Sequence, residues 1–114
     1  MDQLLSGLKA AAEVTRLRLV ALLARAELTV TELTQILGQS QPRVSRHLKL
    51  MVEAGLVERY QEGTWAFYRL ADRGQGAALA DALRQLIPHD DLTISRDFAR
   101  LDSVLADRAA QAQD

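Results

Sequence analysis

The chain has 114 residues, of which 48% are hydrophobic, so it can form one domain with a hydrophobic core. A domain this small is only marginally stable alone, and many such domains gain stability by forming dimers. The absence of cysteine excludes disulfides, thiolate metal sites and thiol redox sensing. We expect no metal and no cofactor.

The charges nearly cancel, with 14 Lys and Arg residues against 15 Asp and Glu residues. They are segregated along the chain, however. Arg43, Arg46 and Lys49 lie in one run without acidic residues, whereas the C-terminal quarter is rich in aspartate. Because nucleic-acid binding depends on the local distribution of charge, near-neutrality does not exclude it.

Membrane and secretory signals are missing from the sequence. No apolar run approaches the roughly 18 residues that span a bilayer, and the N-terminus lacks the cationic start and apolar core of a signal peptide. We therefore expect no membrane partner and a soluble, cytoplasmic protein.

The N-terminal part of the chain predicts two helices. Leu4, Leu5, Leu8 and Ala12 are spaced like one helical face. A second helix is expected from about Thr15 to Arg25, and its wide apolar face predicts burial on much of its circumference.

The next segment has the pattern of a helix-turn-helix. Thr29 followed three residues later by Glu32 is a capping box, which predicts a short helix to about Leu37. Gly38 suits the left-handed end of that helix. Ser40 then caps a second helix, with Pro42 in its first turn. Two helices joined by such a short turn form a helix-turn-helix.

The second of these helices is expected to bury one face and to end at Gly55. Its predicted inward residues are Val44, Leu48, Met51 and Val52. Strands are predicted over Leu56–Arg59 and Trp65–Leu70, with Glu62-Gly63 at the hairpin tip. A hairpin directly after a helix-turn-helix is a wing.

Two further helices complete the expected fold. The first runs from Ala77 to Ile87 and is stopped by Pro88, and the second runs from Thr93 to about Ala112, with fraying expected over residues 109–114. The fold class is therefore mainly α with a small β-hairpin. We expect a DNA-binding domain with dimerisation helices over residues 1–88, and a C-terminal amphipathic helix for dimerisation or linkage over residues 89–114.

Candidate DNA-binding residues lie at the start of the second helix of the helix-turn-helix and around the wing tip. The N-terminal end of such a helix enters the major groove, where Arg suits guanine, Gln suits adenine, and Ser or Lys can bind phosphate. The candidates are Ser40, Gln41, Arg43, Ser45, Arg46, His47, Lys49, Arg59, Gln61 and Thr64.

The sequence allows more than one role for several of these residues. His47 can hydrogen-bond a phosphate or pack at the edge of its helix, and Arg16 and Arg18 can bind phosphates or pair with Glu13. For Trp65 and its aromatic neighbours, packing of the wing against the helices is favoured over base stacking. No spacing points to catalysis, so we expect no enzyme.

The combined pattern resembles the ArsR/SmtB family of bacterial winged-helix repressors over about residues 8–70. The spacing of the run VSRHLK to AGLV and to the wing is more specific for this family than a helix-turn-helix pattern alone. The segments that carry the resemblance are Glu13–Val20, Glu27–Leu33, Ser40–Lys49, Ala54–Val57, Glu62-Gly63 and Tyr68–Leu70.

This resemblance implies a homodimeric repressor that binds a double-stranded DNA operator through two recognition helices and two wings, and that an effector releases. In the family, the first helix and the helix after the wing form the dimer interface. The residues implied here are Leu4, Leu5, Leu8, Leu79, Leu83 and Leu86.

The sequence also departs from the family. Arsenic-sensing members carry Cys-Val-Cys where this chain has Thr29-Val30-Thr31, and the helix after the wing has Asp81 but none of the histidines of the zinc sensors. Neither metal site carries over, so the effector is unknown. The segment Asp97–Arg108 resembles the connector of members fused to a methyltransferase. A regulatory domain of such a protein and a winged-helix module that binds protein are the alternatives.

Overall fold

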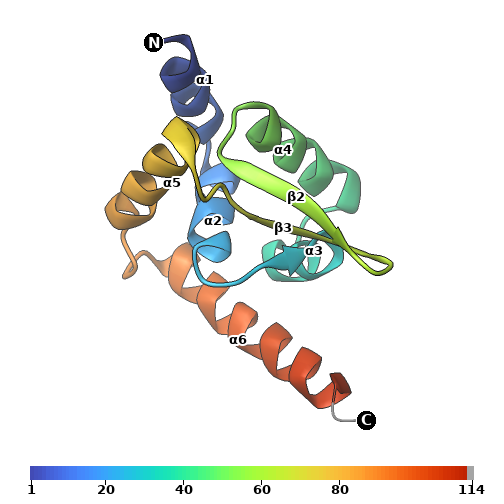
Figure 1. Ribbon diagram of the computed structural model, residues 1–114. Coiled ribbons are helices and arrows are strands. Elements are labelled where there is room, and N and C mark those ends of the chain that lie inside the picture. The colour runs from blue at the N-terminus through green and yellow to red at the C-terminus, as the bar shows by residue number, and fades with distance from the viewer. Residues whose placement is uncertain (113–114) are drawn as a thin grey trace.

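The computed structural model describes residues 1–112, in which six α-helices pack with a small β-sheet whose hairpin projects from the domain (Figure 1). The mainly helical class and the winged helix-turn-helix arrangement are confirmed. The elements in chain order are α1 (Asp2–Ala11), α2 (Val14–Leu23), β1 (Leu28–Thr29), α3 (Val30–Leu37), α4 (Gln41–Glu53), β2 (Val57–Glu62), β3 (Trp65–Leu70), α5 (Gly74–Leu86) and α6 (Leu92–Ala112).

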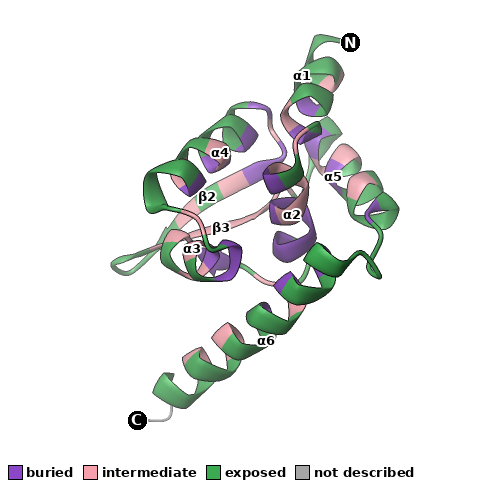
Figure 2. Cartoon of the chain, turned by 180° about the vertical axis from the view of Figure 1, so that it is seen from behind, coloured by how far each residue is buried: buried purple, intermediate pink, exposed green. Residues whose placement is uncertain are grey.

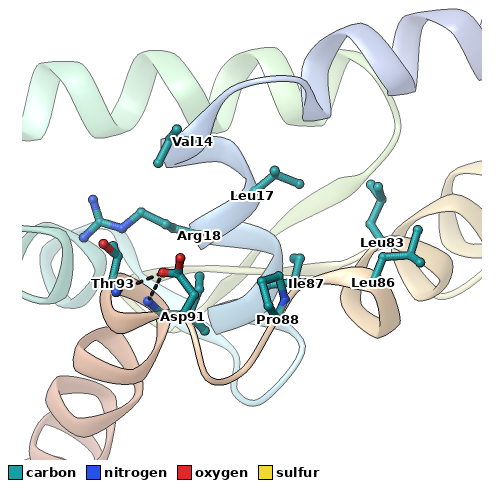
Figure 3. Close-up of a pocket in the computed structure, with 10 residues that line it drawn as sticks. Val14, Leu17, Arg18, Leu83, Leu86, Ile87, Pro88, Asp91 and Thr93 are labelled. Atoms are coloured by element: carbon teal, nitrogen blue, oxygen red, sulfur yellow. Dashed lines mark hydrogen bonds between the residues drawn. The ribbon is translucent and has the colours of Figure 1, made fainter.

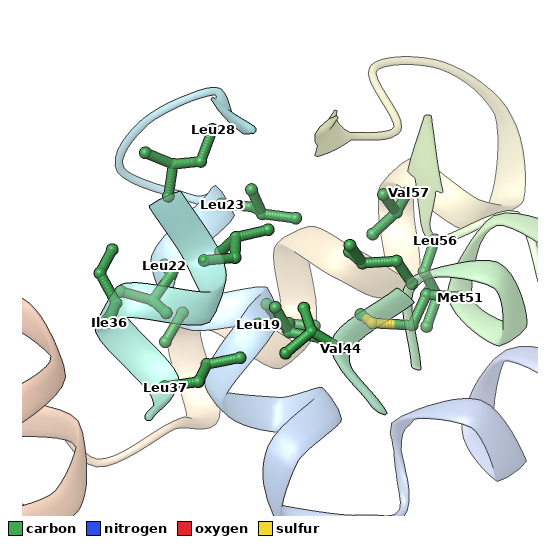
Figure 4. Close-up of a cluster of buried hydrophobic side chains, with 14 of the residues drawn as sticks. Leu19, Leu22, Leu23, Leu28, Ile36, Leu37, Val44, Met51, Leu56 and Val57 are labelled. Carbon is green, nitrogen blue, oxygen red and sulfur yellow. The ribbon is translucent and has the colours of Figure 1, made fainter. Parts of the chain in front are cut away.

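Helix α2 forms the centre of the core, as Figure 2 shows by the burial of most of its ribbon. Leu19, Val20 and Leu22 have no exposed surface, and they pack with side chains from α3, α4 and β2 (Figure 4). The prediction of a helix buried on much of its circumference is therefore confirmed. This core holds α3 and α4 in a fixed relation to each other.

The sheet has three antiparallel strands in the order β1-β3-β2, so the predicted hairpin is only part of it. Strand β1 was not predicted because it has two residues, and its pairing of Leu28 with Tyr68 joins distant parts of the chain. The predicted hairpin tip is also wrong by one residue. Glu62 still pairs with Trp65, so Gly63 and Thr64 form the turn.

Helix α5 begins at Gly74, three residues before the predicted start at Ala77. Its first turn passes so close to the end of α4 that a Cβ atom on Gly76 would overlap the carbonyl oxygen of Gly55. Only glycine allows this approach. The glycine pair thus brings α5 against the loop that leads from α4 into the wing.

Helix α6 lies across the lower part of the domain and packs against α2 and α3 (Figure 1). Ile94, Asp97 and Leu101 are its buried residues. The helix is continuous to Ala112, and the last two residues of the segment in which fraying is expected lie outside the described part. None of the helices in residues 1–112 has the length and apolar character needed to cross a membrane.

Candidate nucleic-acid interface

Local capping interactions position the two helices of the helix-turn-helix. The predicted capping box is present, because the Thr29 amide donates to Glu32 Oε1 at 2.9 Å and the Glu32 amide donates to Thr29 Oγ1 at 3.2 Å. Gly38 ends α3 in the left-handed conformation, with φ of 66°. Ser40 Oγ then accepts a hydrogen bond from the Arg43 amide at 3.4 Å and begins α4.

Helix α4 buries a narrow stripe of side chains against the core. Val44, Leu48 and Met51 have no exposed surface, as predicted. Val52 is 38% exposed, so its predicted inward position is wrong. Successive side chains of a helix point about 100° apart around its axis, so Val52, the residue after Met51, lies outside the buried stripe. The opposite face of α4 is left to solvent.

That opposite face is basic. Gln41, Arg43, Arg46 and Lys49 are exposed, while Ser45 is half-buried at the edge of the face. Within residues 1–112 none of the three cations forms an ion pair, and Glu53 is the first acidic residue of the helix. We call Gln41, Arg43, Arg46 and Lys49 the basic face. Its unneutralised charge is suited to an anionic surface.

His47 does not share this exposure, since only 13% of its side chain is accessible. Its Nδ1 accepts a hydrogen bond from the Arg16 guanidinium at 3.1 Å, and Glu13 Oε2 lies 3.8 Å away. Burial lowers the pKa of His47; Glu13 opposes this effect, and Arg16, Arg43 and Arg46 add to it. The imidazole is therefore neutral near pH 7, and it packs at the edge of α4 against the start of α2.

The wing, formed by β2, β3 and their turn, projects to the same side of the molecule as α4 (Figures 1 and 2). Arg59, Gln61 and Thr64 are exposed along it, and Arg59 has no ion pair in the described chain. Trp65 is 62% exposed, so the expectation that it packs the wing against the helices is wrong for this residue. Its side chain lies on the face of β3 opposite Ala66 and Tyr68, away from the core.

Ion pairs that the sequence did not predict attach α6 to the rest of the domain. Arg18 makes two hydrogen bonds to Asp97, at 2.8 and 2.9 Å, and the Asp97 side chain is only 1% exposed. Arg18 is therefore paired with Asp97 and not with Glu13, and Arg16 contacts Ala10 O and His47. The sequence offered one signal for this ion pair, which is that Asp97 lies on the apolar face of α6 between Ile94 and Leu101.

The six leucines implied in dimerisation differ in exposure. Leu5, Leu8 and Leu86 are exposed, with Leu86 at 78%, whereas Leu4, Leu79 and Leu83 are half-buried. The difference arises because α1 and α5 pack against each other within the chain. A Cβ atom on Gly7 would lie 2.6 Å from Leu79 Cδ2.

No group of three His, Asp or Glu side chains is placed to hold a metal ion among residues 1–112. Thr29 and Thr31, at the start of α3, supply hydroxyl groups where a thiolate site would need sulfur. Oxygen donors of this kind do not make a soft-metal site.

The fold, the basic face and the adjacent wing define a winged helix-turn-helix domain of the DNA-binding type. Residues 13–59 match the family model described as "Bacterial regulatory protein, arsR family". The chain is 34% identical over 76 residues to the arsenical resistance operon repressor of Bacillus subtilis, covering 66% of this chain and 72% of the relative. The chain belongs to the ArsR family.

Two other relatives agree with this assignment. The arsenic resistance regulator ArsR1 of Pseudomonas putida is 48% identical over 63 residues, which are 54% of this chain and 49% of the relative. A homodimeric winged helix-turn-helix DNA-binding domain from Mycobacterium bovis, a possible ArsR-family regulator, superposes with a TM-score of 0.65 at 35% identity, covering 75% of this chain and 77% of that one. The chain spans about half the length of the first arsenic-resistance regulators it matches.

Proposed function

We propose that this protein is a sequence-specific DNA-binding transcriptional regulator, acting as a homodimeric repressor on a double-stranded operator. The observation that carries the proposal is the basic face of α4, whose cations have no ion-pair partner within the described chain and lie beside an exposed wing. Family membership supports the same reading. A regulator of this kind acts on DNA in the cytoplasm and needs no catalytic activity.

In the proposed complex, α4 lies in the major groove and the wing lies along the backbone or in the minor groove. Arg43, Arg46 and Gln41 contact base edges in this proposal, and Ser40, Ser45 and Lys49 contact phosphates. Arg59, Gln61 and Thr64 belong to the wing contacts. His47 acts indirectly, because its half-buried ring holds α4 against Arg16 instead of pointing toward solvent.

The proposed dimer uses the exposed apolar surface on the side away from the wing. Leu5 and Leu8 of α1 and Leu86 of α5 are exposed, as is Val14 at 68%. Figure 3 shows Leu86 and Val14 at the rim of an apolar hollow of about 350 Å³ that is also lined by Leu17, Leu83 and Ile87. A cluster of exposed apolar side chains beside an apolar hollow in a small domain is suited to a second copy.

The effector of the proposed repressor differs from that of the arsenic-resistance relatives. Those relatives are named for arsenic or arsenical resistance, but this chain has no cysteine with which to bind a thiophilic metalloid. We place the DNA-binding and dimerising parts within residues 1–88. We assign residues 89–114 to a C-terminal segment for dimerisation or linkage, in which α6 covers Leu92–Ala112.

The test is selection of duplexes bound by the protein from a random pool, followed by gel shift with the selected sequence. We expect one palindromic motif, because a two-fold dimer presents two α4 helices. Affinity should fall steeply between 50 and 200 mM salt, as phosphate contacts require. Recovery of no motif, or binding that is indifferent to salt, would reject the proposal and favour a protein-binding module.

A further inference from the structure

A cleft of about 420 Å³ separates the wing from the end of α6, and the proposed DNA contacts make no use of it. Its volume lies in the range of roughly 300–1,000 Å³ typical of small-molecule sites. Three elements that are far apart in sequence form its walls: the first turns of α3, strand β3 and the last turns of α6 (Figure 1). We call it the wing cleft and define it by Thr31, Gln35, Trp65, Phe67, Asp107 and Arg108.

Aromatic rings form the wing side of the cleft. Phe67 stacks on Tyr60, with ring centroids 5.6 Å apart, and the guanidinium carbon of Arg108 lies 5.7 Å from the Phe67 centroid, so the Phe67 ring is already in contact with both side chains. Trp65 lies two residues before Phe67, on the same face of β3, and is 62% exposed. A large ring left open to solvent at the mouth of a cavity favours a flat apolar partner. The wall therefore suits a planar aromatic compound.

The positive charges near the cleft are already neutralised. Arg108 donates to both carboxylate oxygens of Glu32, at 3.0 and 2.6 Å, and to Glu27 O at 3.1 Å. Burial alone would raise the pKa of Glu32, but hydrogen bonds from Arg108 and the Thr29 backbone outweigh it and lower the pKa. The ionised Glu32 therefore occupies the positive end of α3, and the only cation among the described residues that line the cleft, Arg108, is already paired.

The remaining charge in the lining is negative. Glu32 and Asp107 carry two negative charges against the single positive charge of Arg108, which leaves one net negative charge. Asp107 is exposed and forms no ion pair within residues 1–112. Thr31 and Gln35, also exposed, add uncharged polar groups. A cation above the exposed Trp65 ring is attracted by both the ring and this charge.

We propose that the wing cleft binds a planar aromatic cation. Such a ligand would stack on Trp65, the exposed ring of the cleft, and place its charge toward Asp107. Because the cleft separates the wing from α6, an occupant changes the position of the wing relative to α3. The ligand would thereby weaken operator binding, and this regulatory half of the proposal depends on the function proposed above.

The binding half is tested on the free protein with N-methylquinolinium as the probe. Trp65 is the only tryptophan, so its fluorescence reports directly on the cleft. We expect saturable quenching, together with backbone chemical-shift changes confined to the starts of α3 and β3 and the end of α6. The probe 2-naphthalenesulfonate, a similar ring system with a negative charge, should bind at least about tenfold more weakly. Quenching without saturation, or equal binding of the anion, would overturn the site.

A matched pair of variants tests the charge. Asp107→Asn should weaken N-methylquinolinium binding by about fivefold, as expected for loss of one nearby charge at the surface. Asp102→Asn removes the same charge from an exposed position of α6 outside the cleft, and should leave the affinity unchanged. Equal effects of the two substitutions would show that only the overall charge of α6 matters and would reject the cleft.

The regulatory half is tested by fluorescence anisotropy of the selected duplex with and without saturating probe. We expect about a tenfold loss of DNA affinity, within the usual range of coupling between two sites. In Asp107→Asn the loss should require a higher probe concentration, which distinguishes this effect from direct binding of the probe to DNA. Unchanged DNA affinity would overturn regulation but not the site. Failure to bind any duplex would instead reject the proposed function and leave the fluorescence result intact.

Discussion

Helices α4 and α6 both carry arginines on their outer surfaces, but the surroundings of these arginines differ. Arg43 and Arg46 of α4 are exposed and have no ion pair within residues 1–112. On α6, Arg100 donates to Ile36 O at 3.2 Å, and Arg108 binds Glu32. The α6 residue Asp97 binds Arg18 below the surface.

The difference separates charges that hold the fold together from charges that are free for a partner. An ion pair within the chain stabilises the domain, and its two opposite charges contribute little to the electrostatic potential at the surface. An unpaired cation adds to the positive potential that attracts DNA. A sequence count of basic residues cannot make this distinction. Mutating the paired charges of α6 should therefore cost stability, whereas mutating the unpaired arginines of α4 should cost affinity for DNA.

The largest effect is expected at Asp97. Replacing it with Ala leaves the Arg18 guanidinium, whose side chain is 13% exposed, without its carboxylate. We expect a loss of about 3 kcal/mol in the free energy of unfolding, measured by urea denaturation. Asp102→Ala, at an exposed position of the same helix, should change stability by less than about 0.5 kcal/mol. Equal losses in the two variants would contradict the role of the pair.

A double variant tests whether the instability of Asp97→Ala comes from leaving the charge of Arg18 buried without a partner. Arg18→Met combined with Asp97→Leu removes both charges and keeps apolar volume between α2 and α6. Such replacements are often neutral, so most of the stability lost in Asp97→Ala should return. A double variant as unstable as the single one would mean that the hydrogen-bond geometry of the pair, and not the burial of a lone charge, dominates.

The next effect concerns α4 and appears in binding. Arg43→Ala or Arg46→Ala should weaken affinity for the selected duplex by roughly 1–3 kcal/mol if the contact is bidentate to a base. Stability should stay the same, because neither side chain has an ion pair to lose in the described chain. Arg84→Ala, which removes an arginine paired with Asp81 on α5, is the matched control and should bind normally. Normal affinity in both α4 variants, measured by anisotropy, would reject their contact with DNA.

A smaller effect is expected for Arg108, whose side chain is 40% exposed. Because solvent screens a pair this exposed, Arg108→Ala should reduce stability by only about 1 kcal/mol. Amide exchange should become faster over the last turns of α6, where the link to α3 is lost. Arg96→Ala on an exposed face of α6 should leave exchange unchanged. Unaltered exchange in Arg108→Ala would mean that apolar contacts alone hold this end of the helix.

The smallest effect is the pH dependence set by His47. Its pKa is lowered mainly by burial, so the unfolded chain binds its proton more readily than the folded one. The stabilising contribution is therefore present above the unfolded pKa of about 6.5 and is lost as the pH falls through the folded pKa. His47→Gln, which can still accept from Arg16, should flatten the fall in stability between pH 8 and 5.5. The same pH dependence in wild type and variant would contradict this assignment.

The helix-turn-helix was predictable because its determinants are local. The capping box joins Thr29 to Glu32, Ser40 caps the amide of Arg43, and Gly38 supplies the left-handed residue between the two helices. Each contact spans only three residues or depends on the conformation of one. The buried stripe of α4 and its exposed basic face follow from helical periodicity alone, with Val52 as the one error at the edge.

The contacts that sequence reasoning missed join distant parts of the chain. Strand β1 is too short to have a pattern, and its partner lies in β3. Trp65 is apolar and was expected to pack, but the side of β3 on which it lies is turned from the core. Asp97 lies 79 residues from Arg18, and no local rule connects them.

The sequence by itself therefore determined where the helices of the DNA-binding motif begin and end, and which face of α4 carries positive charge. Only the tertiary structure decided which charges remain available. His47, which follows Arg46 in the sequence, accepts a hydrogen bond from Arg16, whereas the side chains of Arg43 and Arg46 are exposed to solvent. The physical reason is that caps and periodicity act within a few residues, whereas the strength of an ion pair depends on burial and on distances set by the packing of the whole chain.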